Sequence, residues 1–248
     1  MKILGLDSSG IVASVAIVED ENLIAEYTVN YKKTHSQTLL PMLDELAKMT
    51  ELDMDTIDAI AVAAGPGSFT GLRIGSATAK GLGLALKKPL VEIPTVDALA
   101  YNLYDAKALI CPIMDARRSQ VYTGIYRFED HKLVTVEAQM AVPMMEMIDK
   151  LNERGEEVIF LGDGVPVFAK MIQENLKVPY SFAPAHVNKQ RAAAVAALGA
   201  LYAKEGKVVT AMEHVPEYLR VSQAERERAQ KLKEQEAAGE AAKNEVQP

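Results

Sequence analysis

Short apolar stretches separated by polar turns fill the first thirty residues, which is typical of a β-meander. The expected strands are 3–6, 12–18 and 23–29. From His35 to Met49 the apolar side chains recur instead at helical spacing, which predicts an amphipathic helix with one strongly apolar face. The residues on that face are Leu39, Met42, Leu43, Leu46 and Met49.

The next elements alternate between strand and helix. Residues 57–64, with the sequence IDAIAVAA, are typical of a buried strand, and residues 71–86 of a helix. A short strand at 90–93 and a helix over 96–103 follow. Strands that first pair as hairpins and are then joined through helices predict a mixed sheet.

The second half of the chain repeats the start of the first. A strand, an aspartate, a tight polar turn and a second strand occur at 110–126, as they do at 3–17. Asp115 takes the place of Asp7 in this repeat. A weak internal repeat of this kind predicts two similar α/β lobes around a central cleft.

These patterns divide the chain into three parts. We expect a first lobe at 1–105 and a second lobe at 106–221 that an alanine-rich helix, 189–204, closes. A glycine turn, Gly162-Asp163-Gly164, follows a strand within the second lobe. Residues 222–248 carry alternating charges and almost no large apolar side chains, so we expect a solvated helix or a disordered tail there.

Composition excludes several classes of protein. The net charge of −7, from 34 acidic and 27 basic residues, argues against direct, tight binding of RNA by this chain alone. A single cysteine, Cys111, excludes an intrachain disulfide. The start MKILGLDSSG lacks the pattern of a signal peptide, and no stretch is apolar enough to span a membrane. We therefore expect a cytoplasmic protein.

A glycine-rich run, GPGSFTGLRIG at 65–75, joins the strand to the helix and suggests an anion site. The dinucleotide fingerprint fails at its last glycine, where Thr70 stands, and no Gly-Lys-Ser/Thr follows as in a P-loop. We therefore expect these glycines to serve backbone geometry and packing rather than phosphate binding. The candidate phosphate or nucleotide contacts are the turn residues Asp7, Ser8, Ser9 and Asp115.

A stripe of small residues runs along the same helix at four-residue spacing: Gly71, Gly75, Ala79 and Gly83. Each glycine inside a helix costs roughly 1 kcal/mol relative to alanine, so the stripe predicts a compensating close contact. Two interpretations remain open. The helix packs tightly on its own sheet, or part of this face meets a helix of another subunit.

Other catalytic patterns are weak. Cys111 lies in an apolar strand and is expected to act as a small buried hydrophobe. No G-x-S-x-G sequence surrounds Ser8, Ser9, Ser68 or Ser119, which gives a protease little support. The four histidines are too dispersed to form a local metal pair and are expected to be surface or satisfied residues: His35, His131, His186 and His214.

Six segments together resemble the TsaB family, also called YeaZ, of bacterial proteins that work in making threonylcarbamoyladenosine in tRNA. They are ILGLDSS, THSQTLLPMLDEL, GPGSFTGLRIG, IPTVDALA, MDARRSQVY and PEYLR. The resemblance spans about residues 1–221. It implies an ASKHA-type fold (actin, sugar kinase, Hsp70) of two similar α/β lobes, each a mixed sheet with helices, in agreement with the repeat.

The resemblance also implies a role without chemistry of its own. TsaB is similar to its partner TsaD, which transfers threonylcarbamoyl to the adenosine beside the anticodon of tRNAs that read codons beginning with A. TsaD carries a His-x-x-x-His metal pair, and alignment of residues 88–93 puts those two positions at Thr95 and Leu99. Leucine cannot ligate a metal, so the site is missing. By the same resemblance, TsaE and TsaC complete the pathway, and ATP and magnesium are used by these partners. The chain would contact tRNA only indirectly, through the complex.

The first hypothesis is therefore a non-catalytic subunit that binds and activates TsaD. Its expected interface pairs the apolar helix residues Leu39, Met42, Leu43 and Leu46 with Gly71, Gly75, Ala79 and Gly83. Without the partner, the same surface would form a homodimer. The alternative is a stand-alone ASKHA kinase or ATPase that uses Asp7 and Asp115 with ATP and magnesium.

Overall fold

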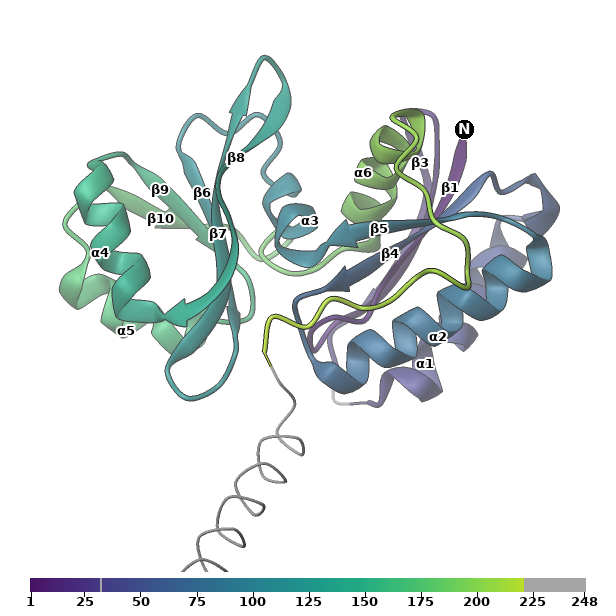
Figure 1. The fold of residues 1–248 in the computed structure, drawn as a ribbon, viewed down its shortest axis with the longest axis horizontal. Helices are drawn as coiled ribbons and strands as arrows, with labels where there is room; N and C mark the ends of the chain where they lie inside the picture. Colours follow the sequence, from purple (N-terminus) through teal and green to yellow (C-terminus); the bar gives the residue numbers. More distant parts are fainter. Residues whose placement is uncertain (32, 221–248) are drawn as a thin grey trace, which may run out of the picture.

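The computed structural model describes residues 1–31 and 33–220. They form two lobes that lie side by side (Figure 1). The predicted tail at 222–248 lies outside the described residues. Within the described residues, no helix is both long and apolar enough to cross a membrane.

The first lobe is built on one five-stranded sheet. Its strands are β1 (Lys2–Asp7), β2 (Ala13–Glu19), β3 (Asn22–Val29), β4 (Ala59–Gly65) and β5 (Leu90–Pro94). They lie in the order β3-β2-β1-β4-β5. The first three strands pair antiparallel, as the meander predicts, whereas β1, β4 and β5 pair parallel. The predicted mixed sheet is confirmed.

Two helices cover one face of this sheet: α1 (His35–Met49) and α2 (Phe69–Leu86). A short 3-10 turn, η1 (Met54–Thr56), precedes β4. The core between sheet and helices is formed by apolar side chains of β1, β2, β4 and α1. Burial of these side chains from both layers is the main source of stability of the lobe.

The second lobe repeats this design. Its strands and helices are β6 (Leu109–Asp115), β7 (Gln120–Glu129), β8 (Lys132–Pro143), α4 (Met144–Arg154), β9 (Val158–Leu161), α5 (Val165–Asn175) and β10 (Tyr180–Phe182). The sheet order is β10-β9-β6-β7-β8. Read from β8, this is the order of the first sheet, with β6 in place of β1 and β9 in place of β4. The repeat seen at Asp7 and Asp115 therefore extends to a whole lobe.

Two further helices, α3 (Thr95–Tyr101) and α6 (Ala192–Lys204), lie between the sheets (Figure 1). Helix α6 packs on β1, β2, β4 and β5 of the first lobe. The expectation that this helix closes the second lobe is wrong. Small residues explain its place, because a Cβ on Gly5 would lie 2.4 Å from the Ala192 carbonyl oxygen, and one on Gly199 would lie 2.5 Å from Ala61 Cβ. The predicted boundary at residue 105 falls between α3 and β6.

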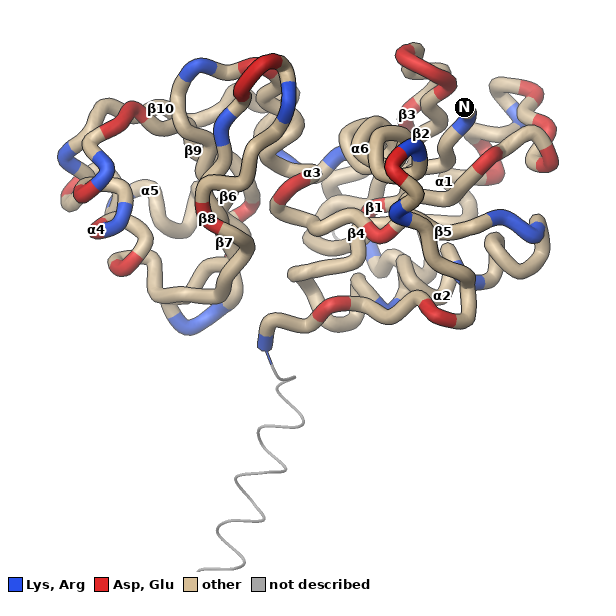
Figure 2. Tube along the Cα trace, turned by 45° about the horizontal axis from the view of Figure 1, so that its top comes forward, with Lys and Arg blue, Asp and Glu red and all other residues tan. Residues whose placement is uncertain are grey.

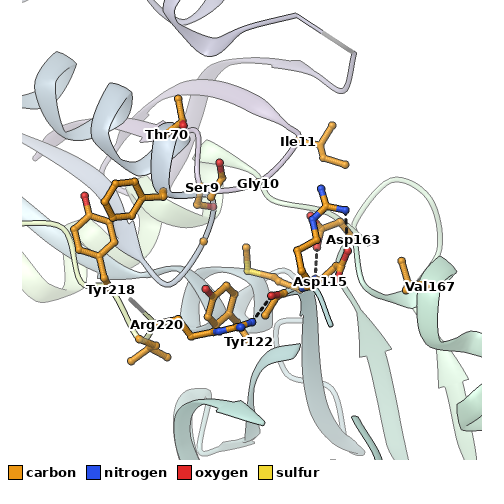
Figure 3. A pocket seen from close by; sticks show the side chains of 17 residues that line it. Ser9, Gly10, Ile11, Thr70, Asp115, Tyr122, Asp163, Val167, Tyr218 and Arg220 are labelled. Atoms are coloured by element: carbon orange, nitrogen blue, oxygen red, sulfur yellow. Dashed lines mark hydrogen bonds and ion pairs between the residues drawn. The ribbon is translucent and has the colours of Figure 1, made fainter. Parts of the chain in front are cut away.

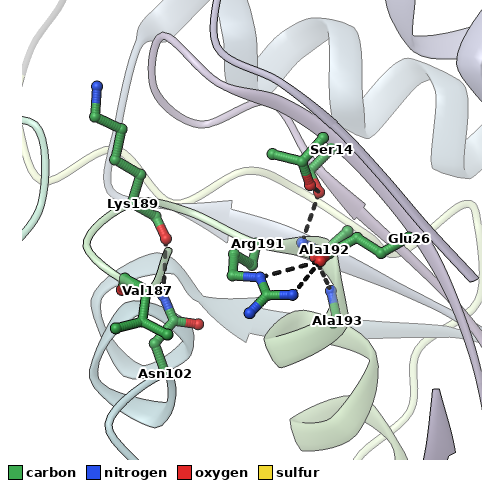
Figure 4. Close-up of polar contacts among 9 residues, drawn as sticks. Ser14, Glu26, Asn102, Val187, Lys189, Arg191, Ala192 and Ala193 are labelled. Carbon is green, nitrogen blue, oxygen red and sulfur yellow. Dashed lines mark hydrogen bonds and ion pairs between the residues drawn. The ribbon is translucent and has the colours of Figure 1, made fainter. Parts of the chain in front are cut away.

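The start of α6 is fixed to the first lobe by polar side chains (Figure 4). The Ala192 amide donates to Ser14 Oγ at 2.9 Å, and the Ala193 amide donates to Glu26 Oε1 at 3.1 Å. Arg191 pairs with the same carboxylate. A carboxylate at a helix N-terminus is stabilised by the free amides and the helix dipole.

Candidate functional site

A cavity of about 580 Å³ lies between the lobes. It is lined by the β1–β2 turn, the start of α2, the β6–β7 turn, the β9–α5 turn and residues 218–220 (Figure 3). Both aspartates of the internal repeat therefore stand at one cleft, Asp115 in its wall and Asp7 beneath the β1–β2 turn. The predicted cleft between the lobes is confirmed.

Asp7 is buried and holds the β1–β2 turn together. Its Oδ1 accepts hydrogen bonds from the Ser9 amide at 2.9 Å and from Ser9 Oγ at 2.7 Å, while Oδ2 has no protein partner. Burial raises the pKa of Asp7 from 3.8 to about 6, and the bonds from Ser9 and the charge of His35 oppose this shift. Ser8 is turned the other way and donates to the Gly71 carbonyl oxygen at 2.9 Å.

The second lobe contributes two carboxylates to the cleft. Asp115 accepts from the Arg117 amide at 2.8 Å, and its other oxygen lies 3.5 Å from the Arg117 guanidinium. Asp163, in the glycine turn after β9, accepts from the Asp115 amide at 3.2 Å. Burial and the nearby charge of Asp115 raise the pKa of Asp163. The glycine turn is visible in the sequence, but Asp163 is not among the predicted site residues; its place in the repeat, after the strand equivalent to β4, is the signal that marks it.

Asp115 and Asp163 line the cleft from the second lobe, Asp7 is buried beneath the turn that lines it from the first, and two amides at the start of α2 are paired within the chain. The Ser68 amide donates to the Ser9 carbonyl oxygen at 2.6 Å, and Ser68 Oγ accepts from the Gly71 amide at 3.3 Å as the cap of α2. Among the described residues, no group of three or more His, Cys, Asp or Glu side chains is arranged to hold a metal ion. The glycine run thus serves close packing against the β1–β2 turn.

The small-residue stripe of α2 faces inward. A Cβ on Gly71 would lie 2.0 Å from the Ser8 carbonyl oxygen, and one on Gly75 would lie 2.5 Å from Ser8 Oγ. The stripe's other members, Ala79 and Gly83, are buried as well. The interpretation that the helix packs on its own sheet is therefore the right one for this face.

The predicted interface residues of α1 share that burial. All four lie in the core of the first lobe: Leu39, Met42, Leu43 and Leu46. A side chain already enclosed by its own lobe offers no free surface to a partner. The proposed set of eight interface residues must be replaced, because the apolar face of α1 and the stripe of α2 stabilise the lobe itself.

A different face of the two helices is open to solvent, and we call it the outer helix face. Its members are Leu40, Thr70, Arg73, Ala77, Gly81 and Leu84. Leu40 is 52% exposed and Leu84 62%. A Cβ on Gly81 would meet nothing within 4 Å. Small residues occur at helical spacing on this face too, at Ala77 and Gly81, and this spacing is the sequence signal for it.

The remaining candidates are accounted for by burial or by single contacts. Cys111 is buried, and burial raises the pKa of its thiol to about 12. His214 is fully buried with Nδ1 2.6 Å from Glu92 Oε1. His35 contacts the Gly10 carbonyl oxygen at 2.9 Å, and the exposed His131 pairs with Asp105. His186 is exposed, so the four histidines remain apart.

Comparisons with known proteins agree with this geometry. A family model described as TsaD, tRNA N6-adenosine threonylcarbamoyltransferase, matches residues 22–228. The tRNA threonylcarbamoyladenosine biosynthesis protein TsaB of Bacillus subtilis is 34% identical over 225 residues, which cover 91% of this chain and 96% of the relative. The TsaB protein of Escherichia coli is 28% identical over 66% of this chain and 72% of its own.

A solved structure has the same fold. YeaZ from Pseudomonas aeruginosa superposes with a TM-score of 0.73 at 25% identity, covering 88% of this chain and 99% of its own. Two copies of one α/β unit, with a cleft between them, define a protein of the ASKHA class. Within that class, the chain belongs to the TsaB family.

Proposed function

We propose that this chain is a non-catalytic subunit in the synthesis of threonylcarbamoyladenosine in tRNA, and that it binds and activates the TsaD-type transferase. The observation that carries the proposal is its close relation to TsaB proteins over nearly its whole length. The match to the TsaD family model supports a partner of the same fold. TsaE and TsaC would supply the other pathway steps, in the cytoplasm.

The positions that align with the partner's metal ligands support a role without catalysis. Thr95 and Leu99 are both buried, with Leu99 in the apolar cluster between α3 and the second sheet. An apolar side chain in this place has no atom that binds a metal. ATP and magnesium would therefore be used by the partners.

The charge distribution supports an indirect role toward tRNA. Figure 2 shows Lys and Arg scattered among Asp and Glu over the described residues in its view. Nucleic-acid binding normally requires a basic patch or stripe. The tRNA would be held by the assembled complex.

The outer helix face is the surface we propose for partner binding. It combines two exposed leucines, Leu40 of α1 and Leu84 of α2, with the exposed small residues Ala77 and Gly81 of α2. Small residues let a partner helix approach closely, and exposed leucines supply apolar area to bury. A partner of the same fold would present an equivalent helix pair, and a four-helix contact would result. Without the partner, two copies of this chain would pair through the same face around a two-fold axis.

Replacement of Gly81 by arginine tests this surface. The side chain would enter open solvent in the free chain, so folding should be preserved, but it would obstruct a helix packed on α2. We expect the Kd for the TsaD partner to rise at least about tenfold, which corresponds to about 1.4 kcal/mol. Isothermal titration with the purified partner measures this change.

Gln173→Arg is the matched control. Gln173 is exposed on α5, the helix that corresponds to α2 in the second lobe. It should leave the Kd unchanged. Equal affinities for wild type, Gly81→Arg and the control would contradict the assignment of the outer helix face.

A further inference from the structure

After α6 the chain returns along the first lobe and then reaches the cleft. We call residues 209–220 the strap; it runs beside β5 and α2 to the mouth of the cleft (Figure 1). Val209 exchanges two backbone hydrogen bonds with Leu90, at 2.8 and 2.9 Å. Further on, the Glu217 amide donates to the Ala64 carbonyl oxygen at 2.7 Å. Backbone bonds thus fix the strap to both β5 and β4.

Side chains reinforce this attachment to the first lobe. Glu92 Oε1 lies 2.6 Å from Nδ1 of the buried His214 and accepts from the Val215 amide at 3.2 Å. At the mouth of the cleft, the ring of Tyr218 packs against Phe69 at 4.5 Å between centroids. A buried polar pair with an aromatic contact resists local opening.

The end of the strap also contacts the second lobe. Gln139 of β8 donates from Nε2 to Glu217 Oε2 at 2.6 Å. The guanidinium of Arg220 donates to the carbonyl oxygen of Ala116, in the β6–β7 turn. Glu217 is therefore bound to the first lobe through its backbone and to the second through its side chain.

The base of the cleft is held independently. Asp97 of α3 accepts from Tyr126 of β7 at 2.7 Å and from Tyr202 of α6 at 3.5 Å. Asn102 donates to the carbonyl oxygens of Val187 and Lys189 at 3.1 and 2.7 Å (Figure 4). The lobes are thus joined both at the base of the cleft and, through the strap, at its mouth.

We propose that the strap is an interlobe tie that fixes the opening of the cleft, so that the chain acts as one rigid body. Closure about a hinge requires the two lobes to be joined on one side only. A second attachment across the mouth removes that freedom, whereas lobes joined by a small interface normally move. The tie would act in the free chain, whether or not a partner is bound.

Distance measurement between spin labels tests the tie. Labels on Lys204→Cys in α6 and Gln173→Cys in α5 would report on separate lobes, since both positions are exposed. The natural Cys111 should stay unlabelled, because it is buried and its thiol pKa is raised to about 12. Dilution with unlabelled protein removes distances between copies. We expect a single narrow distance distribution in the otherwise wild-type chain.

The double variant Gln139→Ala/Arg220→Ala removes the two side-chain hydrogen bonds described above between the strap and the second lobe. The distribution should then broaden or shift by several ångströms while the circular dichroism stays native. Arg127→Ala is the control, because it removes a 3.1 Å contact to Glu156 within the second lobe, and it should leave the distances unchanged. An unchanged distribution in the folded double variant would overturn the proposal. A broad distance distribution in the labelled, otherwise wild-type chain would also overturn the proposal. This second outcome does not depend on whether the strap variant folds.

Discussion

The aspartates at the cleft stabilise the turns in which they lie. Asp7 was selected from the sequence because the repeat pairs it with Asp115, and the structure puts both at the cleft. The burial of Asp7 could not be deduced from the repeat, because it depends on how distant segments pack over the turn, whereas the bonds from Ser9 are local to the turn. The repeat marks the position of Asp163, but its bond from the Asp115 amide joins residues distant in sequence and is visible only in the structure.

Asp7→Asn should stabilise the chain at neutral pH. The pKa of Asp7 is raised from 3.8 to about 6, so the folded state holds a proton that the unfolded state has lost between these values. Stability therefore falls as the pH rises through this window and stays lower above it. Asparagine keeps an oxygen for Ser9 but cannot ionise. We expect a gain of about 1 to 3 kcal/mol in unfolding free energy at about pH 8, vanishing below about pH 4.

Urea denaturation across this pH range measures the effect. Asp58→Asn, at an exposed position, serves as the control and should lack this pH-dependent gain. If the free energy of unfolding differed between Asp7→Asn and wild type by the same amount at every pH, ionisation of Asp7 would not limit stability.

At the scale of the element, α2 carries small residues on two faces with different roles. The sequence predicted the helix and its need for close contact, but spacing alone could not tell which face met the sheet. The inward face is set by the Ser8 turn, which approaches Gly71 and Gly75. The same difficulty explains why α6 was expected in the wrong lobe. An alanine-rich helix that is buried on most sides carries no sequence pattern that specifies which sheet it covers.

Leucine substitutions separate the two faces of α2. Gly75→Leu should destabilise the chain by about 3 kcal/mol or more, because its side chain would overlap Ser8. Gly81→Leu should leave stability unchanged or raise it by up to about 1 kcal/mol, because it improves helix propensity in open space. Thermal and urea unfolding of both variants measure these effects. Equal losses of stability would contradict the assignment of the faces.

At the scale of the molecule, the duplication was readable from the sequence. A strand, an aspartate, a turn and a second strand recur in both halves, and the two sheets share one strand order. The crossing of α6 to the first lobe and the return of the strap were not readable, because both depend on contacts between distant segments. The cleft could be predicted, whereas the outer helix face required the structure.

The proposed function requires the chain to activate a transferase without performing chemistry itself. The most direct test is threonylcarbamoyl formation on tRNA by the purified pathway proteins, with and without this chain, together with ATP turnover by the chain alone. We predict that modification collapses when the chain is omitted and that the isolated chain turns over no ATP. Modification that persists without the chain, together with ATP turnover that is lost in Asp7→Ala, would contradict the claim and identify a stand-alone enzyme.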